Sequence, residues 1–450
     1  MSLDRSPLSR FFVIGTLLLA ALSLSACELS DFDPFGQKEK LLPGERIAVL
    51  ANERSLSADV APGSEDVLLP APTSNPEWPM AGGYANHAMH HIAINTDIQE
   101  VWSRDIGAGA GDDVRFNSTP IVADGMVFAM DTDSEVSAYT VQDGDKVWDK
   151  DLTPDNDDEG HIGGGLAYER GRVFVATGFG VVFALDAKSG EILWSERIGI
   201  PMRVPPTVRG GRLFVVTVDN NLIALDTRDG KTLWTHAGAQ ETASLLGGAS
   251  PAEDAGIVVV PYTSGELFAL RVDTGRVIWQ ENLASIRRTD AVASLAHIRG
   301  RPIIDRGRVI AISHAGVMAA IDLRTGRRVW AREIGGAESP WVAGNFIFTI
   351  TNENELISVS REDGSVRWVR GLPRFQDPED REDPITWSGP VLAGDRLIVA
   401  GSNGDAFSVS PYNGRILGAV EMPDGVSVAP IVAADTVFFL ANDAELVAYR

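Results

Sequence analysis

"LDAKSGEILW", residues 185–194, has the pattern of a strand end, a tight turn and the start of a second strand. Gly190 supplies the positive φ angle that such a short hairpin loop needs. Close copies return as "LDTRDGKTLW" at 225–234 and "IDLRTGRRVW" at 321–330. A phrase that recurs this regularly is either a repeated binding signature or a repeated structural turn, and the two alternatives predict different functions.

The glycine and the tryptophan of this phrase recur four residues apart along most of the chain. The pairs are Gly144/Trp148, Gly190/Trp194, Gly230/Trp234, Gly275/Trp279, Gly326/Trp330 and Gly364/Trp368. A seventh copy, "NGRILG" at 413–418, keeps Gly414 but has Gly418 in place of the tryptophan. Successive tryptophans from Trp148 lie 46, 40, 45, 51 and 38 residues apart. This period is typical of a four-stranded propeller blade of about 40–50 residues.

The number of blades follows from a third-strand phrase that precedes each turn. It occurs eight times, as "VSAYT" (136), "VFALD" (182), "LIALD" (222), "LFALR" (267), "MAAID" (318), "LISVS" (356), "AFSVS" (406) and "LVAYR" (446). No fourth strand follows the eighth copy, but "IQEVWSRDI" at 98–106 is a fourth-strand phrase without a preceding turn. We therefore predict an all-β, eight-bladed β-propeller of four-stranded antiparallel blades. The N-terminal strand at about 98–106 completes the last blade and closes the ring, which removes an exposed sheet edge.

The N-terminal residues have the pattern of a secretory signal peptide. Arg5 and Arg10 precede an apolar run at 11–22 that is too short to span a membrane as a helix. "LSAC" at 24–27 then resembles a bacterial lipobox, which implies cleavage before Cys27 and lipidation of that cysteine.

The residue after the lipidated cysteine is Glu28 rather than the aspartate that typically retains lipoproteins in the inner membrane. The resemblance thus implies a lipid anchor at the periplasmic face of the outer membrane of a Gram-negative bacterium. We expect a lipoprotein signal peptide over 1–26, a lipidated, proline-punctuated tether over 27–75 and the propeller over 76–450.

Composition excludes several classes of function. The formal net charge of −23 argues against binding of nucleic acid or of an anionic lipid surface, because phosphates require a basic patch. Cys27 is the only cysteine, so the mature body offers no disulfide, no cysteine metal site and no thiol nucleophile. We found no grouped Ser-His-Asp arrangement and no phosphate loop, and we expect no catalytic residues.

Two further polar stretches were considered as binding sites. In "HAMHH" (87–91), only His87 and His90 have a useful spacing and no carboxylate is placed beside them, so no metal site is predicted. The acidic insertions at 154–161 and 376–384 are expected to be solvated loops. Binding of calcium or of a basic partner is the alternative for these two runs.

Tryptophan-bearing repeats of this form resemble the quinoprotein family, eight-bladed propellers that hold pyrroloquinoline quinone (PQQ) on the central axis. The resemblance implies a PQQ-dependent dehydrogenase as the enzyme alternative. Such a site needs calcium held by an acidic side chain, an asparagine and a catalytic aspartate, and many members stack the cofactor on a vicinal disulfide. This sequence has no second cysteine and no recurring acidic cluster. We therefore expect no cofactor and predict that the tryptophans pack between neighbouring sheets.

Four features occur together: the lipobox, the tether, "NPEWPMAGGYANHAMHH" at 75–91, and eight quinoprotein-like blades without cofactor ligands. In combination they resemble the BamB family, lipoprotein subunits of the machinery that folds β-barrel proteins into the outer membrane. The resemblance covers the body from about residue 76. It implies a non-enzymatic scaffold that binds the POTRA domains of BamA. The all-β architecture alone motivates the further hypothesis that nascent outer-membrane β-barrel proteins dock on a sheet edge by β-augmentation. A propeller scaffold for another envelope complex is the remaining alternative.

In that family, the loops that precede the first strands of two neighbouring central blades bind BamA. The corresponding segments here are "ASLLGGASP" at 243–251 and "AVASLAHIRGRP" at 291–302. By this match, the residues expected to contact the partner are Leu245, Leu246, Leu295, His297 and Arg299. The second loop of the family carries aspartates where this one has His297 and Arg299, so the charge pattern of a contact there would differ. The alternative is that Leu245 and Leu295 pack beneath their own loops.

Overall fold

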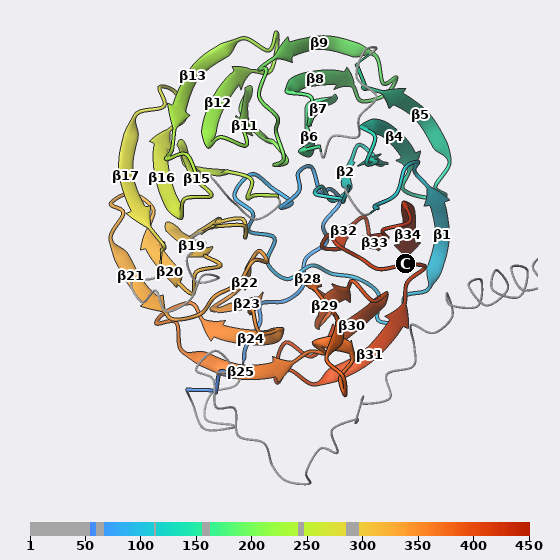
Figure 1. Cartoon of the computed structure of the whole chain (residues 1–450). Helices are drawn as coiled ribbons and strands as arrows, with labels where there is room; N and C mark the ends of the chain where they lie inside the picture. Colours follow the sequence, from blue (N-terminus) through green and yellow to red (C-terminus); the bar gives the residue numbers. More distant parts are fainter. Residues whose placement is uncertain (1–54, 60–66, 112–113, 155–162, 242–246, 285–296) are drawn as a thin grey trace, which may run out of the picture. The chain divides into compact units, whose positions relative to one another are not determined.

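Eight four-stranded antiparallel sheets follow one another around a ring, so the predicted eight-bladed propeller is confirmed (Figure 1). The computed structural model describes residues 55–59, 67–111, 114–154, 163–241, 247–284 and 297–450. No helix among these residues is long and apolar enough to cross a membrane. Cys27 and the predicted signal peptide lie outside the described residues.

The first four blades follow one another along the chain. Blade 1 consists of β2 (Ile121–Ala123), β3 (Met126–Met130), β4 (Glu135–Thr140) and β5 (Lys146–Asp151). Blade 2 consists of β6 (Gly165–Glu169), β7 (Arg172–Ala176), β8 (Val181–Asp186) and β9 (Ile192–Arg197). Blade 3 consists of β10 (Thr207–Arg209), β11 (Arg212–Val216), β12 (Asn221–Asp226) and β13 (Thr232–Ala237). Blade 4 consists of β14 (Ala252–Asp254), β15 (Ile257–Pro261), β16 (Glu266–Arg271) and β17 (Val277–Asn282).

The last four blades include one that combines both ends of the ring. Blade 5 consists of β18 (Ile303–Asp305), β19 (Arg308–Ile312), β20 (Met318–Asp322) and β21 (Arg328–Arg332). Blade 6 consists of β22 (Trp341–Ala343), β23 (Phe346–Ile350), β24 (Glu355–Ser360) and β25 (Val366–Gly371). Blade 7 consists of β28 (Trp387–Ala393), β29 (Arg396–Gly401), β30 (Asp405–Val409) and β31 (Ile416–Glu421). Blade 8 consists of β32 (Ile431–Ala433), β33 (Thr436–Leu440), β34 (Glu445–Tyr449) and β1 (Glu100–Asp105).

Ring closure takes place as the sequence predicts. Strand β1 pairs antiparallel with β34, and Trp102 lies opposite Ala448. The backbones of Gln99 and Arg450 exchange two further hydrogen bonds of 3.0 and 2.9 Å. The outermost strand of blade 8 therefore comes from the N-terminal side of the body, and its other three strands come from the C-terminal side.

The repeated tryptophan joins each blade to the next one. Trp194 on β9 lies opposite the small side chain of Ala184 and reaches across to blade 3, where its indole N–H donates to the carbonyl of Thr227 at 3.0 Å. A Cβ atom added to Gly230, in the following turn, would lie 2.8 Å from the Trp194 ring, so only glycine fits there. Gly230 also has a positive φ of 72°. We call this pairing of an indole with the turn of the next blade the Trp–Gly clasp.

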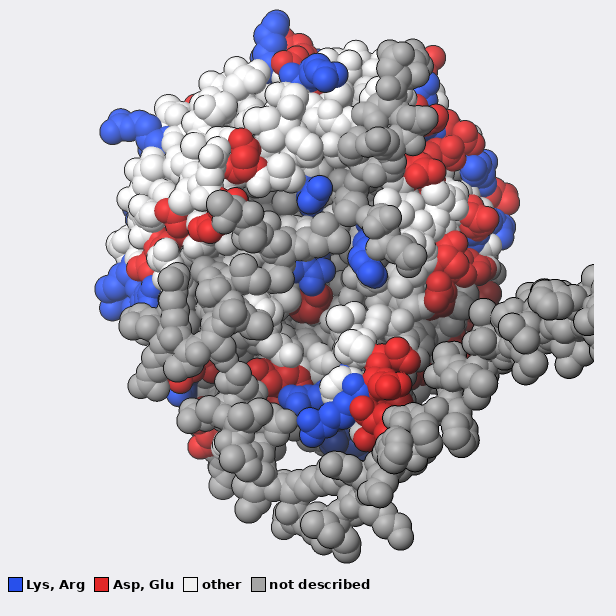
Figure 2. All heavy atoms as spheres, viewed as in Figure 1, with Lys and Arg blue, Asp and Glu red and all other residues white. Residues whose placement is uncertain are grey.

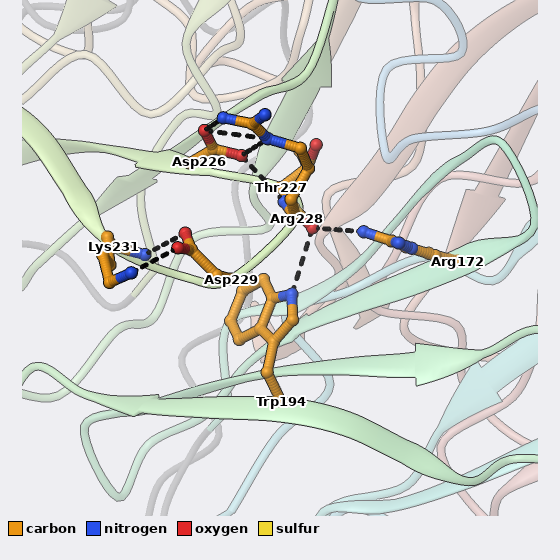
Figure 3. A network of polar contacts seen from close by, with 7 residues as sticks. All are labelled: Arg172, Trp194, Asp226, Thr227, Arg228, Asp229 and Lys231. Atoms are coloured by element: carbon orange, nitrogen blue, oxygen red, sulfur yellow. Dashed lines mark hydrogen bonds and ion pairs between the residues drawn. The ribbon is translucent and has the colours of Figure 1, made fainter.

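The clasp is reinforced by charged residues of the same turn (Figure 3). Arg172 of blade 2 donates to the Thr227 carbonyl at 2.7 Å, alongside Trp194. Asp226 accepts the backbone N–H and the guanidinium of Arg228, which fixes the turn that carries that carbonyl. The repeated phrase is therefore a structural turn, as the predicted packing of the tryptophans between neighbouring sheets requires. Each copy that has both the glycine and the tryptophan serves two junctions, one through each residue.

Seven of the eight junctions have a clasp. The indole donors and carbonyl acceptors are Trp102 to Val141, Trp148 to Ala187, Trp194 to Thr227, Trp234 to Val272, Trp279 to Leu323, Trp330 to Arg361 and Trp368 to Pro411. The eighth junction lies between blades 7 and 8, where β31 carries Gly418 instead of a tryptophan. Blade 8 has no turn before its outermost strand, because β1 arrives from elsewhere in the chain. The seventh copy thus lacks the tryptophan at the junction where no turn glycine could receive it.

The stretch at 75–91 does not form a blade but fills the ring axis. We call residues 75–94 the axial plug; in Figure 1 the chain in this region crosses the centre of the ring. Bonds or bridges connect it to the innermost strand of every blade, or to the turn that follows, through Trp78 to Val122, Met80 to Ala167 and Val208, Ala85 to Glu253, Asn86 to Ile304, His90 to Trp341, Ile92 to Gly394, and Asn75 to Ala434. These contacts satisfy backbone groups that the innermost strands would leave unpaired.

Residues from the predicted tether also contact the propeller. Val67 is buried, and Thr73 forms a parallel bridge with Ile92 of the axial plug. Asp59 exchanges two hydrogen bonds of 2.9 and 2.8 Å with the backbone of Val366 in blade 6. The boundary between tether and propeller at residue 76 stays a prediction, and residues 67–75 have partners on the body.

One acidic insertion differs from expectation. Residues 376–384 were predicted to be a loop, but they form most of an exposed hairpin of β26 (Phe375–Asp377) and β27 (Glu382–Pro384). Asp377 accepts the backbone N–H groups of Glu379 and Asp380, so turn chemistry rather than bulk charge shapes this segment. Most of the other acidic run, 154–161, lies outside the described residues.

Candidate interaction face and axial cavity

The described parts of the two predicted partner loops meet at the ring axis. Gly247 and Gly248, just before β14, line the same cavity as Arg299, just before β18. A Cβ atom added to Gly247 would lie 3.8 Å from Nε of Arg299. Leu245, Leu246 and Leu295 lie outside the described residues, so their partner contacts stay predictions.

His297 lies beneath this face. Its residue surface is 1% exposed, and neither ring nitrogen has a hydrogen-bond partner. Burial, followed by the charges of Arg299 and His314, lowers the pKa of His297 to about 4, so the ring is neutral at physiological pH. A direct contact of this side chain with a partner would require the loop to move, and in the described conformation His297 supports the loop from below.

Arg299 is placed nearer to the surface. Its side chain is 37% exposed and forms an ion pair of 3.5 Å with Glu338, which precedes the first strand of blade 6. The guanidinium therefore lies at the mouth of the axis. It is the one predicted contact residue that the structure both describes and leaves accessible.

Below this mouth is a cavity that sequence analysis missed. Segments leading into the innermost strands of blades 5 to 8, together with residues of the axial plug, surround a small space of about 40 Å³. The polar groups on its wall are His87, Arg301, Glu338 and Ser339. Trp78 and Trp341 stack on the apolar side with ring centroids 6.0 Å apart. No local motif could have revealed it, because its residues come from segments that are remote in sequence.

Two of these polar groups are buried without a full set of partners. Nδ1 of His87 donates to the carbonyl of Pro302 at 2.8 Å, and its Nε2 atom has no partner. Burial, followed by the charge of Arg301, lowers the pKa of His87 to about 3. Burial also lowers the pKa of Arg301, and the nearby Glu338 carboxylate opposes that shift. The cavity is therefore an environment in which an unpaired charge is costly.

The three histidines of "HAMHH" point to separate partners. His87 donates to Pro302, His90 lies 3.6 Å from Asp305, and His91 donates to the carbonyl of Pro70. Within the described ranges, no group of three or more His, Cys, Asp or Glu side chains is placed to hold a metal ion.

The axial residues do not fit the calcium-bound quinone of quinoproteins. Among the residues that line the cavity and its mouth, Glu338 is the only carboxylate and Asn117 the only asparagine, and no aspartate is present. Glu338 is already engaged by Arg299. One shared carboxylate does not provide the oxygen ligands that calcium requires.

Comparison with protein families gives a match over most of the body. The model of the family described as "Outer membrane protein assembly factor BamB" matches residues 89–160 and 155–370. The outer membrane protein assembly factor BamB of Escherichia coli (strain K12) is 30% identical over 349 residues, which cover 76% of this chain and 86% of that protein. The protein of the same name from Moranella endobia is 25% identical over 354 residues, which cover 77% and 89%.

Solved structures show the same fold at lower identity. The crystal structure of BamB from Moraxella catarrhalis aligns with a TM-score of 0.68 and 19% identity, covering 79% of this chain and 100% of that one. A europium-containing methanol dehydrogenase aligns with a TM-score of 0.67 and 14% identity, covering 83% and 98%. The ring architecture is thus shared between assembly factors and quinoproteins, and the fold alone does not choose between them.

Proposed function

The chain belongs to the BamB family of outer membrane protein assembly factors, and from this premise we propose that it is a non-enzymatic scaffold of the outer-membrane β-barrel assembly complex. It binds the POTRA domains of BamA and supports the insertion of β-barrel proteins into the outer membrane. The contact is non-covalent and holds the partner in a productive orientation. Activity as a PQQ-dependent dehydrogenase would contradict this proposal, and reduction of a dye acceptor after addition of PQQ and calcium would reveal it.

One observation carries the proposal. The ends of the two loops, at Gly247 and Gly248 before β14 and at Arg299 before β18, come together on one face although they are separate in sequence. A rigid ring that brings two variable loops side by side is suited to protein recognition. We propose Leu245, Leu246 and Leu295 as apolar contacts and Arg299 as a polar contact at their rim, with His297 supporting the second loop from beneath.

Capture of the partner tests this site. The full-length, tagged chain is expressed in a Gram-negative host, membranes are solubilised in detergent, and co-purified BamA is quantified. Replacing Leu245 and Leu246 together by glutamate is expected to lower capture at least about tenfold, because two apolar contacts of an interface are replaced by charges. The matched control replaces Ile192 and Leu193 by glutamate, since this adjacent apolar pair is exposed on β9, the outermost strand of blade 2, whereas the two loops lead into blades 4 and 5. Equal capture by both variants would refute the site.

Membrane attachment is proposed to depend on Cys27. A Cys27→Ser chain is expected to move from the outer-membrane fraction to the soluble periplasmic fraction, because acyl chains supply the anchor. Retention of the variant in the outer membrane at the wild-type level would contradict lipid anchoring at this residue.

Nascent β-barrel proteins are proposed as a second partner, docking on the outermost strand of blade 7. All six residues of β31 are exposed, and Ile416, Leu417 and Val420 are 41%, 49% and 47% exposed. This strand ends its sheet, so its outer backbone groups are free to add a strand by β-augmentation. A photo-crosslinker placed at Leu417 is expected to capture unfolded barrel protein. Crosslinking that persists after Val420→Pro blocks the strand edge would contradict this docking mode.

A further inference from the structure

The junction between blades 7 and 8 is open on its outer side. β31 carries Gly418 where the outermost strands of the other seven blades carry the tryptophan of the clasp. A Cβ atom added to Gly418 would meet nothing within 4 Å. Ser408, which pairs with Gly418, is only half-buried. The residues opposite the seven tryptophans are all fully buried, namely Ala138, Ala184, Ala224, Ala269, Ala320, Ser358 and Ala448.

The next residue on the same side of β31 is also unusual. Side chains alternate along a strand, so Val420 lies on the same side as Gly418. Charged side chains lie along the rim of the ring (Figure 2). In the other outermost strands, the residue two positions after the tryptophan is charged or a histidine, namely Arg104, Lys150, Glu196, His236, Glu281, Arg332 and Arg370. Val420 is apolar and 47% exposed. We call Ser408, Gly418 and Val420 the bare strip.

Blade 8 presents aromatic side chains toward the bare strip. Ala448 lies opposite Trp102, which reaches to blade 1, so the residues that alternate with Ala448 face blade 7. Tyr449 is one of them, and Phe439, which pairs with Val447, faces the same way. The rings of Phe439 and Tyr449 meet edge to face with centroids 5.8 Å apart. Tyr449 keeps 9% of its surface exposed, whereas the residues in the same register of clasped blades are 0% exposed, as in Leu185, Leu225 and Leu270.

The end of β31 carries negative charge without a basic partner. Asp405 and Glu421 lie directly opposite each other on β30 and β31, and like charges in this arrangement are destabilising. Asp405 accepts a hydrogen bond from the side-chain amide of Asn403, but neither carboxylate forms an ion pair within the part of the chain that the structure describes. A basic group beside them would relieve the repulsion. Charge complementarity therefore favours a partner with a lysine or an arginine near this end of the strand.

A strand added to β31 can supply the missing groups. β31 ends its sheet, so its outer backbone edge can pair with another strand. A glycine on an edge strand is stabilised when an aromatic side chain of the neighbouring strand lies across it. Elsewhere in the ring an indole covers the same surface, as Trp194 covers Ala184. The other blades thus indicate that an aromatic side chain is the group that fits the bare strip.

We propose that the bare strip selects which strands dock on β31: it binds an extended segment of unfolded barrel protein that places an aromatic side chain across Gly418 and a basic side chain beside Glu421. This inference rests on the proposed docking of nascent barrel proteins on β31, and it adds the sequence preference of that docking. The aromatic ring packs on Val420 and toward the aromatic pair of blade 8. The other outermost strands lack this selectivity, because their own tryptophan occupies the place.

Photo-crosslinking with matched peptides tests the aromatic preference. The full-length chain in detergent carries a photo-crosslinker at Leu417, and the probe is a short peptide with a central tryptophan, valine and threonine around it, and lysine at both ends. The control peptide has alanine at the centre. At equal, subsaturating concentrations the tryptophan peptide is expected to crosslink at least about fivefold more, because its ring is buried against apolar and aromatic groups.

Filling the bare strip should abolish this preference. Gly418→Trp supplies the indole that the other blades carry, and Gly418→Val fills the position with a smaller side chain that suits a strand. Both are expected to reduce the preference for the tryptophan peptide to less than about twofold, because the place of its ring is taken. The matched control is Gly371→Trp, at an exposed glycine that ends the outermost strand of blade 6, where an added Cβ atom also meets nothing within 4 Å. It is expected to keep the full preference.

The basic end of the motif is tested separately. A tryptophan peptide with glutamine instead of lysine at its ends is expected to crosslink about threefold less than the lysine peptide, because an exposed charge pair contributes modestly. In Glu421→Gln the two peptides should crosslink more nearly equally. Equal crosslinking of both peptides to the wild type would overturn the assignment of a basic side chain to this end.

The outcomes separate the bare strip from the docking on which it rests. Equal crosslinking of the tryptophan and alanine peptides to the wild type, or an undiminished preference in folded Gly418→Trp and Gly418→Val chains, would overturn the selectivity and leave strand docking on β31 standing. Failure of every peptide to crosslink, with capture of BamA intact, would overturn both the selectivity and the docking while leaving the scaffold role in place.

Discussion

The Trp–Gly clasp predicts a difference between two glycines of blade 5. Gly326 and Gly307 both have a φ of 72°. A Cβ atom added to Gly326 would lie 2.6 Å from Cγ of Trp279, whereas one added to Gly307 would meet nothing within 4 Å. Both alanine variants incur the strain of a left-handed backbone, about 1–2 kcal/mol. Gly326→Ala must also displace an indole that donates to Leu323 at 2.7 Å.

Overpacking of this kind costs about 1–3 kcal/mol, so Gly326→Ala is expected to lose about 2–5 kcal/mol and Gly307→Ala only about 1–2 kcal/mol. Urea unfolding of the full-length chain, compared at equal m-value, measures both changes. In a Trp279→Leu background the excess cost of Gly326→Ala should disappear, which a double-mutant cycle records as coupling. Equal losses for the two glycines, or no coupling to Trp279, would refute the clasp as a source of junction stability.

Three further predictions concern the axis, the ring closure and the open junction. The folded-state pKa of His87 is lowered from 6.5 to about 3, so the unfolded chain binds more protons between these values and stability falls as the pH falls through this window. His87→Asn, which retains a donor and tolerates the positive φ of 59° at this position, should reduce the change of the urea midpoint with pH between pH 6.5 and 4. An unchanged pH dependence would exclude His87 as its source. Trp102→Ala should lower the free energy of unfolding by about 3–5 kcal/mol, because it removes the clasp of the closing strand, and a loss below about 1 kcal/mol in urea unfolding would contradict that role. Hydrogen exchange should be faster for the amides that join β31 to β30 than for those that join β13 to β12, because the junction after β31 has no clasp. Equal protection of the two sets of amides would contradict a role of the clasp in holding the outermost strands.

The repeats made the ring predictable from sequence, because blade structure is local. Gly190 and Trp194 lie within one hairpin, and strand alternation around them follows from neighbouring residues. Trp102 without a preceding turn was enough to predict the closing strand. The partner of each tryptophan was not predictable, because the turn glycine that receives it belongs to the next blade.

The axial residues escaped prediction for a related reason. The plug has no strand alternation, since each of its residues meets a different blade, as with Trp78 at Val122 and Ala85 at Glu253. Arg301 and Glu338 stand in separate pre-strand segments, and neither is part of a motif. Arg299 was singled out by resemblance to a family, whereas its pairing with Glu338 needed the structure.

The pairing of β1 with β34 has a consequence for folding kinetics. Each of the first seven blades is contiguous in sequence, so its strands can associate over loops of a few residues. The last blade must join Trp102 to Ala448 across almost the entire body. Closing a loop about eight times as long as a blade costs roughly 2 kcal/mol more in conformational entropy, because each doubling of the loop length adds about 0.6 kcal/mol. High contact order of this kind slows the final step. Because residues 67–105 are synthesised before the C-terminal strands, β1 must wait for β34, and the lifetime of this unclosed ring sets how long the edge of blade 8 stays open to aggregation.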